Sequence, residues 1–136
     1  MGDRPLSVLK AGTPGGKTLA ASGAVDLIAA GDVGGIPSIT PNPDGRVKLD
    51  LSFQFVAGSA GAAAAGTLQL LVDGAPSGPG WLVHTGLGAA ADVLKQYTVT
   101  LEGWLSAGGV HTVNARLTWS GGATIALQQI SYALRG

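Results

Sequence analysis

Hydrophobic and polar residues alternate along two long stretches of the chain, residues 46–56 and 110–119. Such alternation places one set of side chains on each face of an extended strand and predicts half-buried β-strands. In the first stretch the apolar face comprises Val47, Leu49, Leu51, Phe53 and Phe55. In the second it comprises Val113, Ala115, Leu117 and Trp119, opposite a face of Thr112, Asn114, Arg116 and Thr118. We therefore expect Trp119 to lie in the core.

Less regular patterns predict further strands at residues 22–30, 36–40, 67–73, 81–85, 97–102 and 123–134. In the segment 67–73, alternation turns Leu68, Leu70 and Val72 inward and leaves Leu71 on the outer face. In the last segment the inward set changes parity, which predicts a β-bulge near Gln128 and Gln129. The three final strands follow one another through glycine-rich turns, so we expect them to pair as an antiparallel meander.

Glycine and proline, 23 and 7 residues respectively, interrupt the chain too often for helices of ordinary length. The sequence therefore predicts an all-β protein: a single antiparallel β-sandwich, jelly-roll-like, with seven to eight strands. We expect an extended N-terminal arm at residues 1–20, in which Leu6, Val8 and Leu9 could add an edge strand, followed by a sandwich domain at residues 21–136.

Charged residues make up 12% of the chain, and the formal net charge is zero, whereas about 25% is typical. So little charge predicts that neighbouring molecules cover much of the surface. The alternative is a monomer with a surface of Ser, Thr, Gln and Gly. Without a cluster of Lys and Arg, we expect no nucleic-acid partner. No segment approaches about 18 uninterrupted apolar residues, and no secretion signal is evident, so we expect no membrane association.

One short motif is typical of nucleotide binding. Residues 11–18 begin with Ala11 and end in Gly16-Lys17-Thr18, as in a loosened phosphate-binding loop. That function requires a helix opening at Lys17 and a parallel sheet behind it. Gly23 interrupts the helix, and every later segment is predicted as an antiparallel strand, so nucleotide binding remains a distant alternative.

Catalytic and metal-binding patterns are also weak. His84 and His111 are the two histidines, and no further ligands stand at metal-binding spacing. His111 opens a strand after a Gly-Gly turn, where a turn-stabilising or interface role is expected. The sequence has no cysteine and no nucleophile elbow. We expect no enzyme, with no catalytic, metal or cofactor-binding residue and no cofactor.

The remaining tryptophans are candidates for contact with a partner. Trp81 follows a Gly-Pro-Gly turn, and Trp104 ends a strand, so both are expected at the surface. Either side chain could stack on a sugar or anchor a contact between subunits, because interfaces are enriched in tryptophan.

The order of turns and strands in the last third of the chain resembles a known group of proteins. A strand at residues 97–101, the Gly109-Val110-His111-Thr112-Val113 segment and a strand ending in Trp119 are similar to the C-terminal half of small accessory β-sandwiches on tailed-phage particles. These have jelly rolls of the tumour-necrosis-factor/C1q type. The resemblance implies a virion protein, often trimeric, that decorates the head.

The leading hypothesis is therefore a capsid decoration, or cement, protein that binds the assembled head lattice and stabilises it. Its partners would be the major capsid protein and itself, as a homotrimer. It would be made in the host cytoplasm and located on the virion surface. The expected interface residues are Leu6, Val8, Leu9, Trp81 and Trp104. A tail-tip or fibre-head module that binds host-surface glycan is the alternative.

Overall fold

The structure is a computed structural model that describes residues 8–19, 23–32, 34–41, 45–57, 65–84, 94–106, 108–120 and 125–136. These residues contain ten β-strands and no helix. The strands are β1 (Val8–Gly12), β2 (Lys17–Leu19), β3 (Gly23–Asp26), β4 (Ser38–Ile39), β5 (Arg46–Ala57), β6 (Ala65–Val72), β7 (Ala75–His84), β8 (Leu94–Trp104), β9 (His111–Ser120) and β10 (Ile125–Arg135).

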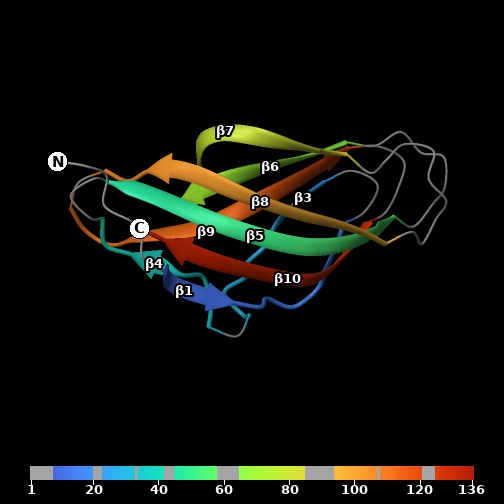
Figure 1. Cartoon of the computed structure of the whole chain (residues 1–136), viewed down its shortest axis with the longest axis horizontal. Helices are drawn as coiled ribbons and strands as arrows, with labels where there is room; N and C mark the ends of the chain where they lie inside the picture. The colour runs from blue at the N-terminus through green and yellow to red at the C-terminus, as the bar shows by residue number, and fades with distance from the viewer. Residues whose placement is uncertain are drawn as a thin grey trace.

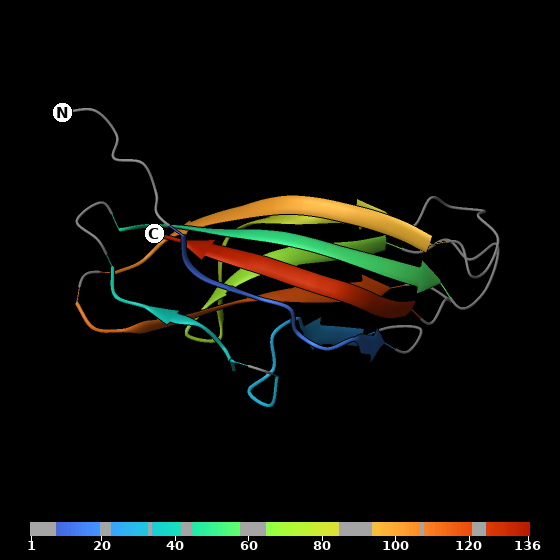
Figure 2. The ribbon, with the colours of Figure 1, turned by 60° about the horizontal axis from the view of Figure 1, so that its bottom comes forward.

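The strands form two antiparallel sheets that pack face to face, as Figures 1 and 2 show. Sheet A has the order β1-β10-β5-β8, and β2 also pairs with β10. Sheet B has the order β3-β9-β6-β7, and β4 also pairs with β9. This arrangement confirms the predicted all-β, jelly-roll-like sandwich.

Two short strands from the expected N-terminal arm raise the strand number above the predicted seven to eight. β1 and β2 both pair with β10, and β1 is an edge strand of sheet A. The edge strand that Val8 and Leu9 suggested is therefore present. Leu6 lies outside the described residues.

The expected meander of the last three strands is wrong. β8 and β10 both pair with β5 in sheet A, whereas β9 pairs with β3, β4 and β6 in sheet B. The chain thus crosses from one sheet to the other between consecutive strands. Glycine-rich turns are compatible with such crossings as well as with hairpins, so turn residues alone do not select the partner strand.

β7 is longer than predicted because a segment expected to be a turn belongs to the strand. Pro76 and Pro79 cannot donate backbone hydrogen bonds, but β7 is an edge strand, where proline is tolerated. A register shift opposite Gln69 accommodates the extra residues, and Gly78 has a positive φ of 77°. The Gln69 side-chain amide donates to the Gly78 carbonyl at 3.2 Å.

The core lies between the sheets and includes the predicted inward-facing Val47, Leu49, Leu51 and Phe53, whereas the side chain of Phe55 lies outside the described set. Trp119 is 2% exposed, which confirms its place in the core. The predicted bulge in β10 is also present: the register with β5 shifts between Gln128 and Ser131, and Gln129 has a positive φ of 49°. The bulge allows residues on both sides of the shift to point inward, including Leu127, Ile130 and Leu134.

The outer face of sheet B is partly covered, which alternation did not predict. Leu71 stands outside the core cluster, as expected, but it is only 1% exposed. Its register partner on β9 is Asn114, which is also buried. The backbone of Ile28, in the segment after β3, contacts the Asn114 side chain. That segment therefore covers Asn114 next to Leu71.

Candidate functional site

The outer face of sheet A carries polar side chains in regular rows across three strands. Residues that pair across a sheet point to the same side, so the register defines each row. The row Thr98–Ser52–Ser131 is followed by Thr100–Asp50–Ala133, Glu102–Lys48–Arg135 and finally Trp104–Arg46. In Figure 1 the strands β8, β5 and β10 lie in front, and no described segment crosses over them.

Two ion pairs join four of the charged side chains on this face. Lys48 Nζ lies 3.0 Å from Glu102 Oε1. Arg135 donates to Asp50 Oδ2 through Nε at 2.7 Å, and the Thr100 hydroxyl donates to Asp50 Oδ1 at 2.6 Å. Burial raises the pKa of Asp50, but the hydrogen bonds from Thr100 and Arg135 and the nearby positive charges outweigh it, so the pKa is lowered. Asp50 is therefore an anionic acceptor at neutral pH.

A shallow depression of about 210 Å³ lies over the middle of this face. Three hydroxyl-bearing residues line it, one from each strand: Thr98, Ser52 and Ser131. Asp50 and Ala133 lie beside them. The depression exists because small side chains meet here, directly after the bulge in β10. Bulges often adjoin functional sites because they redirect side chains.

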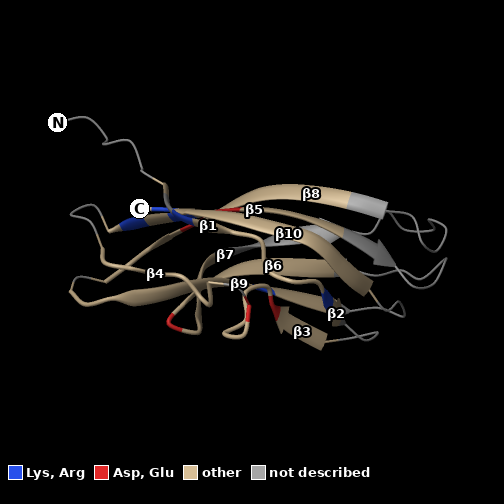
Figure 3. Ribbon diagram, turned by 90° about the horizontal axis from the view of Figure 1, so that it is seen from below, with Lys and Arg blue, Asp and Glu red and all other residues tan. Residues whose placement is uncertain are grey.

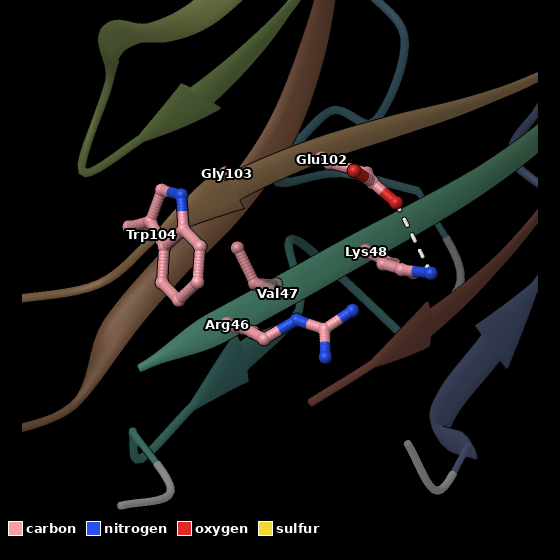
Figure 4. Close-up of a pocket in the computed structure, with 6 residues that line it drawn as sticks. All are labelled: Arg46, Val47, Lys48, Glu102, Gly103 and Trp104. Atoms are coloured by element: carbon pink, nitrogen blue, oxygen red, sulfur yellow. Dashed lines mark ion pairs between the residues drawn. The ribbon is translucent and has the colours of Figure 1, made fainter. Parts of the chain in front are cut away.

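A second, smaller hollow of about 30 Å³ lies at the end of the same face, under Trp104. Figure 4 shows Trp104 beside Arg46, its register partner on β5, with the Lys48–Glu102 ion pair in the next row. Trp104 is 67% exposed. Gly103 faces inward and packs tightly, because a Cβ there would lie 2.6 Å from Leu70 Cδ2. The strand is thus held firmly where it presents the tryptophan.

Of the predicted interface residues, the structure describes the side chains of Val8 and Trp104. Val8 is 62% exposed at the start of β1, and Trp104 is exposed at the end of β8. Leu9 lies in β1 and Trp81 in β7, but their side chains are outside the described set, as is the whole of Leu6.

Most of the exposed large apolar side chains among the described residues lie toward one end of the sandwich. The exposed side chains of this kind are Val8, Ile36, Trp104 and Val110. At this end β1 and β9 begin and β8 and β10 finish, as Figure 2 shows. Ile36 precedes β4, and because β4 pairs antiparallel with β9 and Pro37 accepts from the Val113 N–H, Ile36 lies farther along β9 than Val110. We call Val8 and Val110, at the starts of β1 and β9, the apolar end.

His111 joins two connections next to this end. Its Nδ1 lies 2.6 Å from Asp73 Oδ2 in the β6–β7 turn, and its Nε2 lies 3.1 Å from the Ser106 carbonyl after β8. Asp73 also accepts from the Thr112 backbone N–H at 3.0 Å. Each ring nitrogen faces an acceptor, which favours the doubly protonated imidazolium. The expected turn-stabilising role of His111 is confirmed, and neither nitrogen is positioned to act as a general base.

This arrangement predicts a pH-dependent contribution to stability. The hydrogen bond that His111 donates to Asp73 raises the pKa of His111 and lowers the pKa of Asp73. The histidine contribution is complete below the unfolded pKa of about 6.5 and is lost as pH rises through the folded pKa. The aspartate contribution is complete above about 3.9 and is lost as pH falls through its folded pKa.

Thermal unfolding of the wild type and His111→Gln at pH 5.5 and pH 8.5 tests this prediction. The wild type should exceed the variant in Tm by more at pH 5.5 than at pH 8.5. Asp73→Asn should remove the same pH dependence, and the double variant should add nothing further. An equal Tm difference at both pH values would contradict the imidazolium assignment.

The nucleotide-binding alternative lacks its structural context. Lys17 begins β2 instead of a helix. Its Nζ lies 2.9 Å from both carboxylate oxygens of Asp32, and the Ala29 N–H donates to the same carboxylate. The lysine that would contact phosphate therefore attaches β2 to the loop after β3.

Other site types also find no support in the part of the chain that the structure describes. No three His, Asp or Glu side chains there gather as metal ligands. Over the same residues, no helix is long and apolar enough to cross a membrane. Figure 3 shows the sparse charges: Lys and Arg near the C-terminus and by β2, and acidic residues both on sheet A near β5 and beside sheet B.

The fold places the chain among antiparallel, jelly-roll-like β-sandwiches. The structure of infectious bursal disease virus, Gx strain, matches it with a TM-score of 0.55 and 12% identity, covering 97% of this chain and 32% of the viral chain. The VP2 subviral particle of the same virus gives 0.52 and 12%, covering 93% and 31%. The chain thus spans about a third of these viral chains, and at this identity the similarity shows the fold alone.

A family 35 carbohydrate-binding module from Clostridium thermocellum gives a TM-score of only 0.38 at 13% identity, covering 90% of this chain and 97% of the module, so that similarity carries no functional weight. No protein-family model matches the sequence. No curated protein is detectably similar to it in sequence.

Proposed function

We propose that this chain is a structural protein of a tailed-phage virion, a decoration protein that binds the assembled head lattice as a homotrimer. The observation that carries the proposal is the apolar end on a sandwich whose fold is shared with virus-particle chains. Val8 is 62% and Val110 66% exposed, and exposed apolar side chains that gather in one region are typical of protein contacts. In this proposal the chain is made in the host cytoplasm and ends on the virion surface.

The low charge of the chain supports the same proposal. Several of its ionic groups pair within the molecule, including Lys17 with Asp32 and Arg116 with Asp26. Paired charges protect poorly against association, so the surface is suited to neighbours in a lattice. A partner that binds only the assembled head stabilises that head by mass action.

Two measurements test the proposal. Native mass spectrometry should give about 40 kDa, three times the chain mass of 13.4 kDa. Heads that lack the protein should bind it in co-sedimentation and gain heat resistance. Val110→Asp should weaken this binding at least about tenfold, or about 1.4 kcal/mol, because a carboxylate would be desolvated at the contact.

Thr118→Ala provides the matched control, because Thr118 is exposed on the outer face of β9, away from the apolar end. This variant should bind heads as the wild type does. A monomeric mass, together with heads whose heat resistance is unchanged by the protein, would contradict the decoration role.

The alternative of a tail-tip or fibre-head module binding host-surface glycan is favoured by one observation. Trp104 is exposed beside Arg46 on an uncovered polar face, and an exposed aromatic ring of this kind can stack on a sugar. Trp104 lies at the same end of the sandwich as Val8 and Val110, on the polar face of sheet A.

A further inference from the structure

We propose that the outer face of sheet A binds a neutral polysaccharide along a polar track that runs from the Thr98 row to Trp104. The track consists of the four rows already described: Thr98–Ser52–Ser131, Thr100–Asp50–Ala133, Glu102–Lys48–Arg135 and Trp104–Arg46. The proposal goes beyond lattice binding and does not depend on it. Val8 pairs with Arg135 and borders the track, whereas Val110 precedes β9 in sheet B and lies outside it.

The first argument is the hydrogen-bonding chemistry of the depression. A hydroxyl donates one hydrogen bond and accepts two, so three hydroxyls from adjacent strands match the mixed donors and acceptors of a sugar. Their mutual contacts are long: Thr98 Oγ1 lies 3.4 Å from Ser52 Oγ, and Ser131 Oγ lies 3.5 Å from the Ser52 carbonyl. Hydrogen bonds of this length are weak, so replacing them by shorter hydrogen bonds to a ligand costs little free energy.

The second argument concerns the charge of the ligand. Lys48 is paired with Glu102, and Arg135 with Asp50, so the ionic groups in the middle of the track already compensate one another. A strongly anionic chain would have to compete with these acids. A neutral chain can instead accept from the lysine and arginine and donate to the carboxylates. The middle of the track therefore favours neutral sugars, and Arg46 adds one positive charge at its Trp104 end.

The third argument distinguishes a sugar from a protein partner. Protein interfaces are depleted of Lys, Glu, Asp, Ser and Ala, and these residue types make up much of the track, including Lys48, Asp50, Ser52, Ser131 and Ala133. A protein contact would leave many of these polar groups desolvated without partners. The apolar end has the opposite composition.

The fourth argument is the position of the aromatic ring. Thr98 and Trp104 stand six residues apart on β8, which corresponds to about 20 Å of strand. The track is therefore long enough for several consecutive sugar units. Trp104 would offer its ring to the C–H face of a sugar at one end, while the depression would receive hydroxyls at the other. Binding sites of this kind combine an apolar platform with a few positioned polar groups.

The experiment is affinity electrophoresis of the full chain in gels containing one soluble polysaccharide each. The neutral probes are dextran, laminarin, xylan and galactan, and alginate and polygalacturonate are the anionic probes. At least one neutral probe should retard the wild type. Trp104→Ala should weaken that retardation at least tenfold in apparent Kd, and Ser131→Leu, which fills the depression, should do the same.

Two control variants separate this proposal from lattice binding. Thr118→Ala on the outer face of sheet B and Val110→Asp at the apolar end should both retain wild-type retardation. Circular dichroism and Tm of Trp104→Ala should match the wild type, because the ring is exposed. This match shows that the variant is folded and that its loss of binding does not come from unfolding. If the wild type fails to bind heads but is retarded by a neutral probe, the track proposal stands and the decoration role is wrong.

Several results would contradict the proposed polysaccharide track. No retardation by any neutral probe overturns it, and so does equal retardation of wild type, Trp104→Ala and Ser131→Leu. Retardation by the anionic probes alone overturns the neutral-ligand assignment. If Trp104→Ala abolishes head binding in the absence of any polysaccharide affinity, the face is a protein contact.

Discussion

Replacement of Trp119 by alanine is expected to lower the free energy of unfolding by about 3–5 kcal/mol. Trp119 is the largest fully buried side chain of the described residues, at 2% exposure. It lies on β9, the strand that pairs with β3 and β6 in the middle of sheet B. Its removal leaves a cavity that this strand cannot close without losing register on both sides.

The glycine opposite Trp119 explains how a ring of this size fits. Gly66 is its register partner on β6, and a Cβ at Gly66 would lie 2.8 Å from Trp119 Cε3. The same pairing recurs in sheet A, where the Tyr132 ring covers Gly12. An aromatic ring over a cross-strand glycine offsets the poor strand propensity of that glycine. Gly66→Ala is therefore expected to cost about 1–3 kcal/mol through overpacking.

A double-mutant cycle measured by urea unfolding checks both expectations. In the Trp119→Ala background, Gly66→Ala should cost nothing or should stabilise, because the added methyl group enters the vacated space. Gly23→Ala is the matched control, since Gly23 is another strand glycine paired with Trp119 but its Cβ position has no neighbour within 4 Å. Additive effects of the two substitutions would show that the ring does not rest on Gly66.

The features that could be predicted from the sequence are those that depend on local periodicity. The alternation in β5 and β9 placed Leu49, Phe53 and Trp119 in the core correctly. The parity change in β10 located the bulge, because one extra residue must shift every following side chain to the other face. The position of His111 after a turn indicated its structural role, although its partner Asp73 comes from a distant turn.

The features that could not be predicted depend on contacts between distant segments. Alternation gives the face on which a side chain lies but not the strand that pairs beside it, so the crossing between sheets replaced the expected meander. It also does not reveal what covers an outer face, and both Leu71 and Asn114 are buried there.

In the candidate site, too, some features could be predicted from local alternation and others depend on the pairing of distant strands. Lys48, Asp50 and Ser52 were assigned to the outer face of β5 by alternation, and Trp104 was expected at the surface. Neither the row that joins Ser52 to Ser131 nor the depression over it could be predicted, because both require the register of β5 against β8 and β10. The bulge after Gln128 gave the one sequence signal near this position.

Replacement of Asn114 by leucine is expected to cost about 2–5 kcal/mol, although its position in the alternation suggested a solvent-exposed residue. Asn114 is 6% exposed. Its side-chain oxygen accepts from the Ile28 N–H at 3.1 Å, and its amide donates to the Ile28 carbonyl at 2.7 Å. The Asn114 side chain thus takes the place of a backbone hydrogen-bond partner for Ile28, just after β3 ends. On either side of it, the Leu27 N–H donates to the Ala115 carbonyl and the Pro37 carbonyl accepts from the Val113 N–H.

Leucine would leave both buried backbone groups of Ile28 without a partner, and each such group costs about 1–3 kcal/mol.

Asn114→Asp separates the two bonds, because an ionised carboxylate keeps the acceptor but loses the donor. Burial would raise the pKa of this new carboxyl group, so its deficit relative to the wild type should shrink from pH 7 to pH 4.5 as the group becomes protonated and donates to the Ile28 carbonyl. Thermal and urea unfolding of both variants measures these differences, with Thr118→Ala, on the same face of β9 but exposed, as the control within about 0.5 kcal/mol. If Asn114→Leu matches that control, water must reach Ile28, and the Asn114 side chain does not hold the segment after β3 against β9.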